Sequence, residues 1–162
     1  MVIKVYRKCE EFPNGGLLTQ HLENNVNVGD EVLMGGPMAM SVYCGYGEFS
    51  HKGNSLKNKK KRVGLIAGGS GITPLYSIAQ ASTLARDGLD ITFLYSNKTK
   101  DDMLCLDKLQ ELERQNPNFH LYNTLTRHKP ETHGEWEGLT GRVNMDLLKS
   151  INFPMPADDT YV

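Results

Sequence analysis

The alternation of apolar and polar positions divides the chain into two parts. In the first part, short β-prone runs are separated by turns rich in glycine, proline and asparagine, and they predict strands at 2–6, 31–34 and 40–43. A short helix is predicted after Gly16, because Leu18 and Leu22 have the i, i+4 spacing of one helical face. This pattern is typical of an antiparallel barrel or sandwich.

The second part alternates between strand and helix patterns, which favours βα units and a parallel sheet. The predicted strands are 63–67, 91–95, 120–126 and 160–162, and the predicted helices are 75–86, 102–115 and 144–150. Gly88 is the expected stop of the first of these helices, and Asn144 is the expected N-cap of the last. A charged, glycine-containing segment, 51–62, is the predicted boundary between the two parts.

The turn after the strand at 63–67 carries the strongest chemical signal. Gly68, Gly69 and Gly71 can take positive φ and let a ligand approach the backbone, while Pro74 suits the first turn of a helix. Such a helix start attracts phosphate, so the pattern predicts a nucleotide site. The segment does not complete G-x-G-x-x-G, and a purely structural glycine turn is the alternative.

Two further patterns narrow the class of nucleotide. The second strand ends in Tyr-Ser-Asn-Lys, without the carboxylate that usually binds the adenine ribose. The glycine turn also lacks the Gly-Lys-Ser/Thr ending of a triphosphate loop, so a nucleotide hydrolase is disfavoured.

Composition excludes several other classes. The 162 residues include 18 Lys and Arg and 19 Asp and Glu, so there is no overall basic field for nucleic acid. The three cysteines have no C-x-x-C spacing, which argues against a disulfide framework or zinc site and suits a reducing compartment. No apolar stretch approaches the ~20 residues of a membrane span, and no signal peptide is evident. We expect a cytoplasmic protein, or one at the cytosolic face of a membrane.

Two motifs resemble those of one family. Residues 68–74, Gly-Gly-Ser-Gly-Ile-Thr-Pro after a Gly-Leu-Ile-Ala strand, resemble the pyridine-nucleotide motif of the ferredoxin-NADP reductase superfamily, and within it most closely that of cytochrome b5 reductases and the reductase module of assimilatory nitrate reductases. Residues 2–6 and 12–20 resemble the family's strand, loop and helix at the FAD pyrophosphate. The resemblance extends over nearly the whole chain.

The resemblance implies a fold and an activity. An incomplete antiparallel FAD-binding β-barrel part over 1–55 is expected to precede an α/β parallel-sheet domain for NADH or NADPH over 62–162, truncated before its last strands. Hydride would pass to FAD, and electrons would leave to cytochrome b5 or a fused haem domain. The resemblance implies no catalytic side chain and no metal, because the cofactors supply the chemistry.

The resemblance also implies which residues bind the cofactors. For FAD these are Val2, Lys4, Gly16, Leu17, Leu18 and Thr19, with Thr73 against the isoalloxazine ring, and for the nicotinamide nucleotide they are Gly68, Gly69, Ser70, Gly71 and Pro74. Ordinary packing is the alternative for Val2, Leu17 and Leu18. Where relatives of NADH type have aspartate and arginine, this chain has Thr126 and Arg127. That pair suits a 2′-phosphate, so we expect NADPH to be accepted at least as well as NADH, with a basic surface loop as the alternative.

Other features have simpler explanations. The basic run at 57–62 is expected to be a solvated linker, with docking to an acidic haem domain as the alternative. His128 and His133 do not suggest a metal site, and Trp136 is expected to pack. A nucleotide-binding remnant without flavin is the second function class. The family's flavin-face and Cys-Gly-Pro segments are expected outside this sequence, and these residues alone are expected to be unstable.

Overall fold

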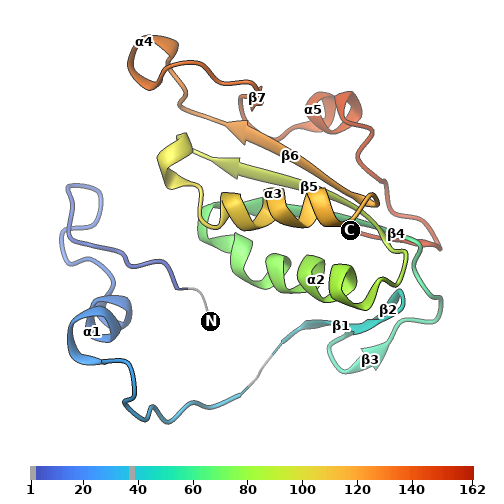
Figure 1. The fold of residues 1–162 in the computed structure, drawn as a ribbon, viewed down its shortest axis with the longest axis horizontal. Helices are drawn as coiled ribbons and strands as arrows, with labels where there is room; N and C mark the ends of the chain where they lie inside the picture. The colour runs from blue at the N-terminus through green and yellow to red at the C-terminus, as the bar shows by residue number, and fades with distance from the viewer. Residues whose placement is uncertain (1–2, 37–38) are drawn as a thin grey trace. The chain divides into compact units, whose positions relative to one another are not determined.

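The computed structural model describes residues 3–36 and 39–162 (Figure 1). The chain divides into two compact units, 1–38 and 39–162. The boundary predicted between residues 55 and 62 lies within the second unit, and as a division between domains it stays a prediction.

The first unit is built around one helix, α1 (Leu17–Asn25), which confirms the helix predicted after Gly16. Extended chain precedes it, and the Gly16 amide donates a hydrogen bond to the Tyr6 carbonyl over 2.7 Å. The strands predicted at 2–6 and 31–34 are wrong for the residues described, because neither 3–6 nor 31–34 forms a strand. A β-prone run becomes a strand only where it has a pairing partner, and these runs have none within the described unit.

The second unit begins with an antiparallel sheet of β1 (Ser41–Gly45), β2 (Glu48–His51) and β3 (Asn54–Ser55), paired in that order. The predicted strand at 40–43 is therefore confirmed as β1, while β2 and β3 were not predicted. Phe49 of β2 stacks on Tyr161, with ring centroids 4.5 Å apart, so this small sheet packs onto the rest of the unit.

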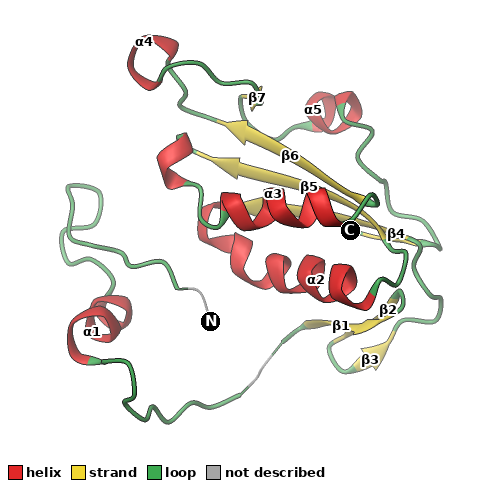
Figure 2. Ribbon diagram, in the orientation of Figure 1, coloured by secondary structure: helices red, strands yellow, loops and turns green. Residues whose placement is uncertain are grey.

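A five-stranded parallel sheet forms the centre of the second unit (Figure 2). Its strands lie in the order β7-β6-β5-β4-β8, and their bounds are β4 (Arg62–Gly68), β5 (Asp90–Asn97), β6 (Phe119–Leu125), β7 (Leu139–Thr140) and β8 (Thr160–Tyr161). The four predicted strands are thus confirmed. Successive strands run outward from β4 to β7, and the chain then returns to β8 on the other side of β4. Ligands of open α/β sheets bind where the strand order reverses in this way, so the carboxyl end of β4 is the expected binding edge.

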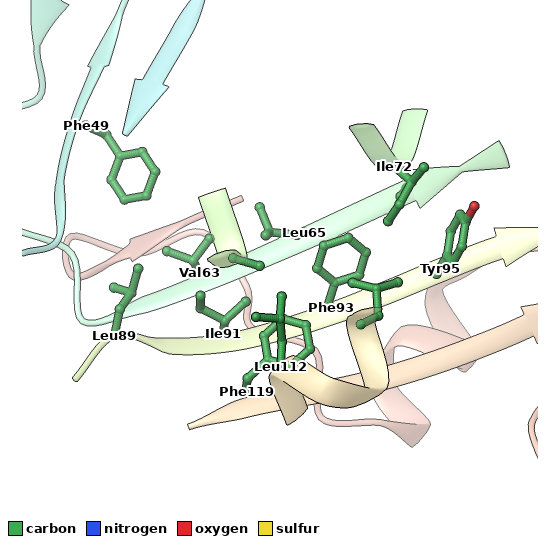
Figure 3. Packing of buried hydrophobic residues seen from close by; sticks show 13 residues of the cluster. Phe49, Val63, Leu65, Ile72, Leu89, Ile91, Phe93, Tyr95, Leu112 and Phe119 are labelled. Carbon is green, nitrogen blue, oxygen red and sulfur yellow. The ribbon is translucent and has the colours of Figure 1, made fainter. Parts of the chain in front are cut away.

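Helices cover both faces of this sheet. One face packs against α2 (Ile72–Ala85) and α3 (Leu106–Gln115), and the buried cluster there includes Phe93, Ile72 and Leu112 (Figure 3). The other face packs against α5 (Met145–Ser150), through Leu94 and Phe153. Phe93 and Leu94 face opposite sides because successive strand residues alternate. The predicted fold class, an antiparallel β part followed by a parallel α/β sheet, is confirmed.

Three details of the helices differ from expectation. The helix predicted at 102–115 begins only at Leu106, after a short 3-10 turn η2 (Lys100–Asp102), which Thr99 and Asp102 cap reciprocally. Helix α2 ends at Ala85, one residue before the predicted end, and Arg86, in the left-handed conformation at φ 50°, caps it in place of the expected Gly88. The segment between β6 and α5, for which no element was predicted, contains α4 (Pro130–His133) and β7. Asn144 caps α5 as predicted, accepting a hydrogen bond from the Leu147 amide over 2.9 Å.

Candidate nucleotide site

The glycine turn connects β4 to α2 at the carboxyl edge of the sheet. Strand β4 ends at Gly68, a 3-10 turn η1 (Gly69–Gly71) follows, and α2 begins at Ile72, which is fully buried. Gly69 has φ of +50°, a conformation that favours glycine. A Cβ added to Gly68, Gly69 or Gly71 would meet no atom within 4 Å. The turn therefore leaves open space for a ligand against its backbone.

The start of α2 suits an anionic ligand. Gly71 gives it no side-chain cap, and its first turn contains no acidic residue. The helix dipole places partial positive charge at this end, where a diphosphate would gain from it. Thr73 turns its hydroxyl toward the Ser70 carbonyl at 3.4 Å, and Pro74 follows in the first turn, where its missing amide hydrogen costs nothing. The residues at 68–74 thus fit the diphosphate-binding role predicted for them.

The sequence did not predict the role of Tyr95, whose buried side chain contacts this turn from the protein interior. The Tyr95 hydroxyl donates a hydrogen bond to the Gly69 carbonyl and accepts one from the Leu104 amide, each over 3.1 Å. Tyr95 is fully buried, and this burial raises the pKa of its phenol despite the Leu104 hydrogen bond, which lowers it. The signal available in the sequence was a polar-tipped aromatic residue at the end of an otherwise apolar strand, where such a residue needs a hydrogen-bond partner.

Thr126 and Arg127 lie at the same edge of the sheet, directly after β6. The Thr126 amide donates to the Asn97 carbonyl over 2.9 Å, and its hydroxyl donates to the same oxygen over 3.2 Å. The Arg127 amide donates to the Lys98 carbonyl over 2.9 Å. Both side chains are exposed. The parallel register therefore brings this pair and the glycine turn to one edge, separated by β5.

The residues predicted to bind FAD lie in the first unit, except Val2, which is outside the described residues. Leu17 is 83% exposed and Leu18 is 70% exposed, so neither packs into a core in this unit. The Thr19 hydroxyl donates to the Gly16 carbonyl and accepts from the Tyr6 amide, each over 3.2 Å. The ammonium group of Lys4 lies 5.7 Å from the centre of the Tyr6 ring. Tyr6 thus contacts Lys4 as well as the start of α1, so the described residues of the predicted FAD group lie close together within this unit.

A separate hollow of about 650 Å³ lies between α3, β6 and residues 135–139, and no predicted site residue lines it. Trp136 lies at its wall and donates its indole N–H to the Leu139 carbonyl over 2.8 Å. The indole leaves no room for a Cβ on Gly138, so Trp136 packs closely, as predicted.

Comparison with known proteins identifies similar sequences. Residues 65–162 match the family model of the oxidoreductase NAD-binding domain. The chain is 35% identical to NADH-cytochrome b5 reductase 1 of Homo sapiens, over all of this chain and 54% of that protein. It is 35% identical to the NADH nitrate reductase of Volvox carteri, over 94% of this chain and 18% of that protein. The chain thus spans about half the length of the cytochrome b5 reductase.

Solved structures agree with the observed architecture. The cytochrome b5 reductase domain of Ulva prolifera nitrate reductase superimposes with a TM-score of 0.81 at 30% identity, over 91% of this chain and 55% of that one. The FAD/NAD-binding domain of nitric oxide dioxygenase from Vibrio cholerae matches with a TM-score of 0.66 at 19% identity, over 91% of this chain and 52% of that one. At that identity the second match concerns the fold alone.

Proposed function

We propose that this chain, which belongs to the oxidoreductase NAD-binding domain family, forms the nucleotide-accepting part of a flavin-dependent reductase. The observation that carries the proposal is the glycine turn. It lies where the strand order reverses, and three of its glycines leave open space in front of a helix start. A bound nicotinamide nucleotide would supply a hydride and FAD would accept it, while the protein binds and orients both.

The chain's own groups have distinct parts in this proposal. Gly68, Gly69 and Gly71 let the nucleotide lie against the backbone, and the start of α2 favours its diphosphate. In the first unit, the start of α1 and Lys4 would hold the diphosphate arm of FAD. Because the Thr19 hydroxyl already donates to the Gly16 carbonyl, its first contribution is to shape this loop.

The electron acceptor we propose is cytochrome b5 or a haem domain of the same polypeptide. Relatives of both kinds are equally similar, at 35% identity for a cytochrome b5 reductase and for a nitrate reductase. The reductase module of a nitrate reductase is therefore the second candidate. A remnant that binds nucleotide without flavin is the third.

We further propose that NADPH is accepted at least as well as NADH. The neutral hydroxyl of Thr126 donates a hydrogen bond to the Asn97 carbonyl, and the next residue is the exposed Arg127. Nothing in that pair repels a 2′-phosphate, and a guanidinium is well suited to bind one. Relatives named for each nucleotide exist, since the chain is 33% identical to the NADPH nitrate reductase of Pichia angusta and 35% identical to the NADH nitrate reductase of Volvox carteri.

We propose a cytoplasmic location. Cys9, Cys44 and Cys105 are all unpaired in the structure, which suits a reducing compartment. Among the described residues, no helix is long and apolar enough to cross a membrane.

The test is anaerobic reduction of the bound flavin. The native protein, purified with excess FAD, is expected to retain it and to absorb near ~450 nm, and NADH or NADPH should bleach that band. Flavin that is retained but not bleached by either nucleotide would contradict the activity. A protein that binds nucleotide but never flavin would favour the remnant.

A further inference from the structure

We propose that Tyr95 is a positioning residue for nucleotide binding, which acts by fixing the conformation of the glycine turn. The inference rests on the proposed function, because it assumes that the turn binds NADH or NADPH. Tyr95 does not face the open space in front of the turn. It acts from inside the protein, through the Gly69 carbonyl.

Tyr95 is held rigidly in the sheet. It pairs with Ala67 in the parallel register of β5 and β4, so it lies beside the last residues of the strand that leads into the turn. Its side chain is fully buried, and it lies next to Ile72, the first residue of α2, at the end of the apolar cluster (Figure 3). A side chain fixed in this way can set the position of a flexible glycine segment above it.

The hydrogen bond to Gly69 controls the orientation of one peptide group. The Gly69 carbonyl also accepts from the Ile72 amide, so both of its acceptor positions are directed toward the protein. In a planar trans peptide the next N–H points opposite to the carbonyl. Holding the Gly69 oxygen inward therefore directs the Ser70 N–H outward, toward the side where a diphosphate would lie.

Glycine makes this control necessary. Gly69 has φ of +50° and no side chain, so apart from the hydrogen bonds from Tyr95 and Ile72 little restricts rotation of the peptide group that follows it. Gly68 and Gly71 on either side are also free of close neighbours at the Cβ position. Without the phenol, the turn would sample other orientations, and a ligand would have to select the competent one from this mixture.

The second hydrogen bond links the turn to a distant segment. The Leu104 amide donates to the same hydroxyl, just before the residue that caps α3. One hydroxyl thus binds two backbone groups from segments that are far apart in the sequence. Removal of the hydroxyl takes this partner from the Leu104 amide and leaves the Gly69 carbonyl with only the Ile72 amide, so the glycine turn is held less firmly.

The test is Tyr95→Phe in the flavin-loaded native protein, with Tyr122→Phe as the matched control. Tyr122 is a half-buried tyrosine of the neighbouring strand β6, and it packs on the opposite face of the sheet with Leu94 and Phe153. We expect Tyr95→Phe to raise the KM and Kd for NADH and NADPH about tenfold, with kcat within about twofold and flavin content unchanged. Tyr122→Phe should leave KM unchanged.

A merely structural hydroxyl would behave differently. It would lower the melting temperature of Tyr95→Phe while the KM of the folded enzyme stayed within twofold of the wild type, and this result would overturn the proposal. A double-mutant cycle with Gly69→Ala adds a second criterion. If Tyr95 acts through the turn, the two changes are less than additive in Kd, and strict additivity counts against it.

Two remaining outcomes are also decisive. If wild-type protein binds neither NADH nor NADPH, the proposed function and this inference fail together, whereas a wild type that binds nucleotide isolates the role of Tyr95.

If Tyr95→Phe does not fold, an NMR titration of the wild-type protein tests the inference instead. The Leu104 amide resonance should then shift during an NADH titration with the same Kd as that of Gly69, and a Leu104 resonance that does not respond would overturn the inference.

Discussion

The aromatic ring of Phe153 occupies the place that a side chain on Gly64 would need. A Cβ added to Gly64 would lie 2.6 Å from two carbons of the ring, closer than packed carbon atoms approach. Gly64 lies in the middle of β4, and Phe153 belongs to the cluster that covers the α5 face of the sheet. Gly64 is therefore needed for close packing against Phe153, whereas the glycines that follow at 68–71 belong to the nucleotide turn.

Gly64→Ala is expected to destabilise the protein by about 1–3 kcal/mol, because Phe153 must shift out of a well-packed position. Urea or thermal unfolding measures this loss. Gly68→Ala is the matched control on the same strand, since its added Cβ would meet no atom within 4 Å. It should cost little stability and should instead weaken nucleotide binding. Equal loss of stability in the two variants would contradict this packing argument.

Thr126→Asp is expected to shift the nucleotide preference toward NADH. The carboxylate would repel a 2′-phosphate and could accept hydrogen bonds from ribose hydroxyls, so the KM for NADPH should rise at least ~10-fold while that for NADH changes little. Steady-state kinetics with both nucleotides gives the ratio. Thr132→Asp in α4 introduces the same charge at another exposed threonine and should not change the ratio. A similar change in both variants would show that the position is not specific.

Asn144→Ala should cost about 1 kcal/mol of stability, because it removes the side chain that accepts from the Leu147 amide at the start of α5. Chemical denaturation measures the difference. Asn144→Asp keeps an acceptor at the same place and should restore most of the loss. If Asp is no better than Ala, the cap does not contribute as proposed.

The raised pKa of Tyr95 predicts a loss of stability at alkaline pH. In the unfolded chain tyrosine releases its proton near pH ~10, whereas the buried phenol of the folded protein keeps it to higher pH. The contribution is therefore complete below about pH 10 and declines as pH rises from there through the folded-state pKa. Denaturation of the wild type and of Tyr95→Phe between pH 8 and pH 11 isolates this effect, because all other titratable groups are the same in the two proteins. Parallel pH profiles would contradict it.

The elements between Arg62 and Leu125 could be predicted from the sequence because they have strong, regular patterns. Strand β4 is nearly a continuous apolar run, β5 has the apolar run 93–95 at its centre, and α3 has leucines on one buried face, so each pattern favours one type of element. The first part was harder. Runs at 2–6 and 31–34 have strand composition, but composition does not provide the neighbouring strand that a ladder needs, and no strand forms in their described residues. The two-residue strands β3 and β7 are too short to leave any periodicity.

The sequence predicts the glycine turn and Thr126 as parts of the site, but it does not predict the buried hydroxyl of Tyr95 that supports the turn. Glycines before a helix are a recognisable pattern, and the parallel topology explains why Thr126 comes to the same edge as Gly68. The sequence places Tyr95 at the end of the second strand and predicts no contact between it and the glycine turn. Its partners are the backbone groups of Gly69 and Leu104, and a backbone group carries no signature in the sequence that could identify them.

The central claim is that a reduced nicotinamide nucleotide binds at the turn between β4 and α2. Hydrogen–deuterium exchange of the native flavoprotein, with and without saturating NADH or NADPH, tests this most directly. We predict slower exchange in peptides that contain 68–74 and 126–127, with no change in the peptide that contains α5. Protection that is confined to other segments, or no protection with either nucleotide, would contradict the account.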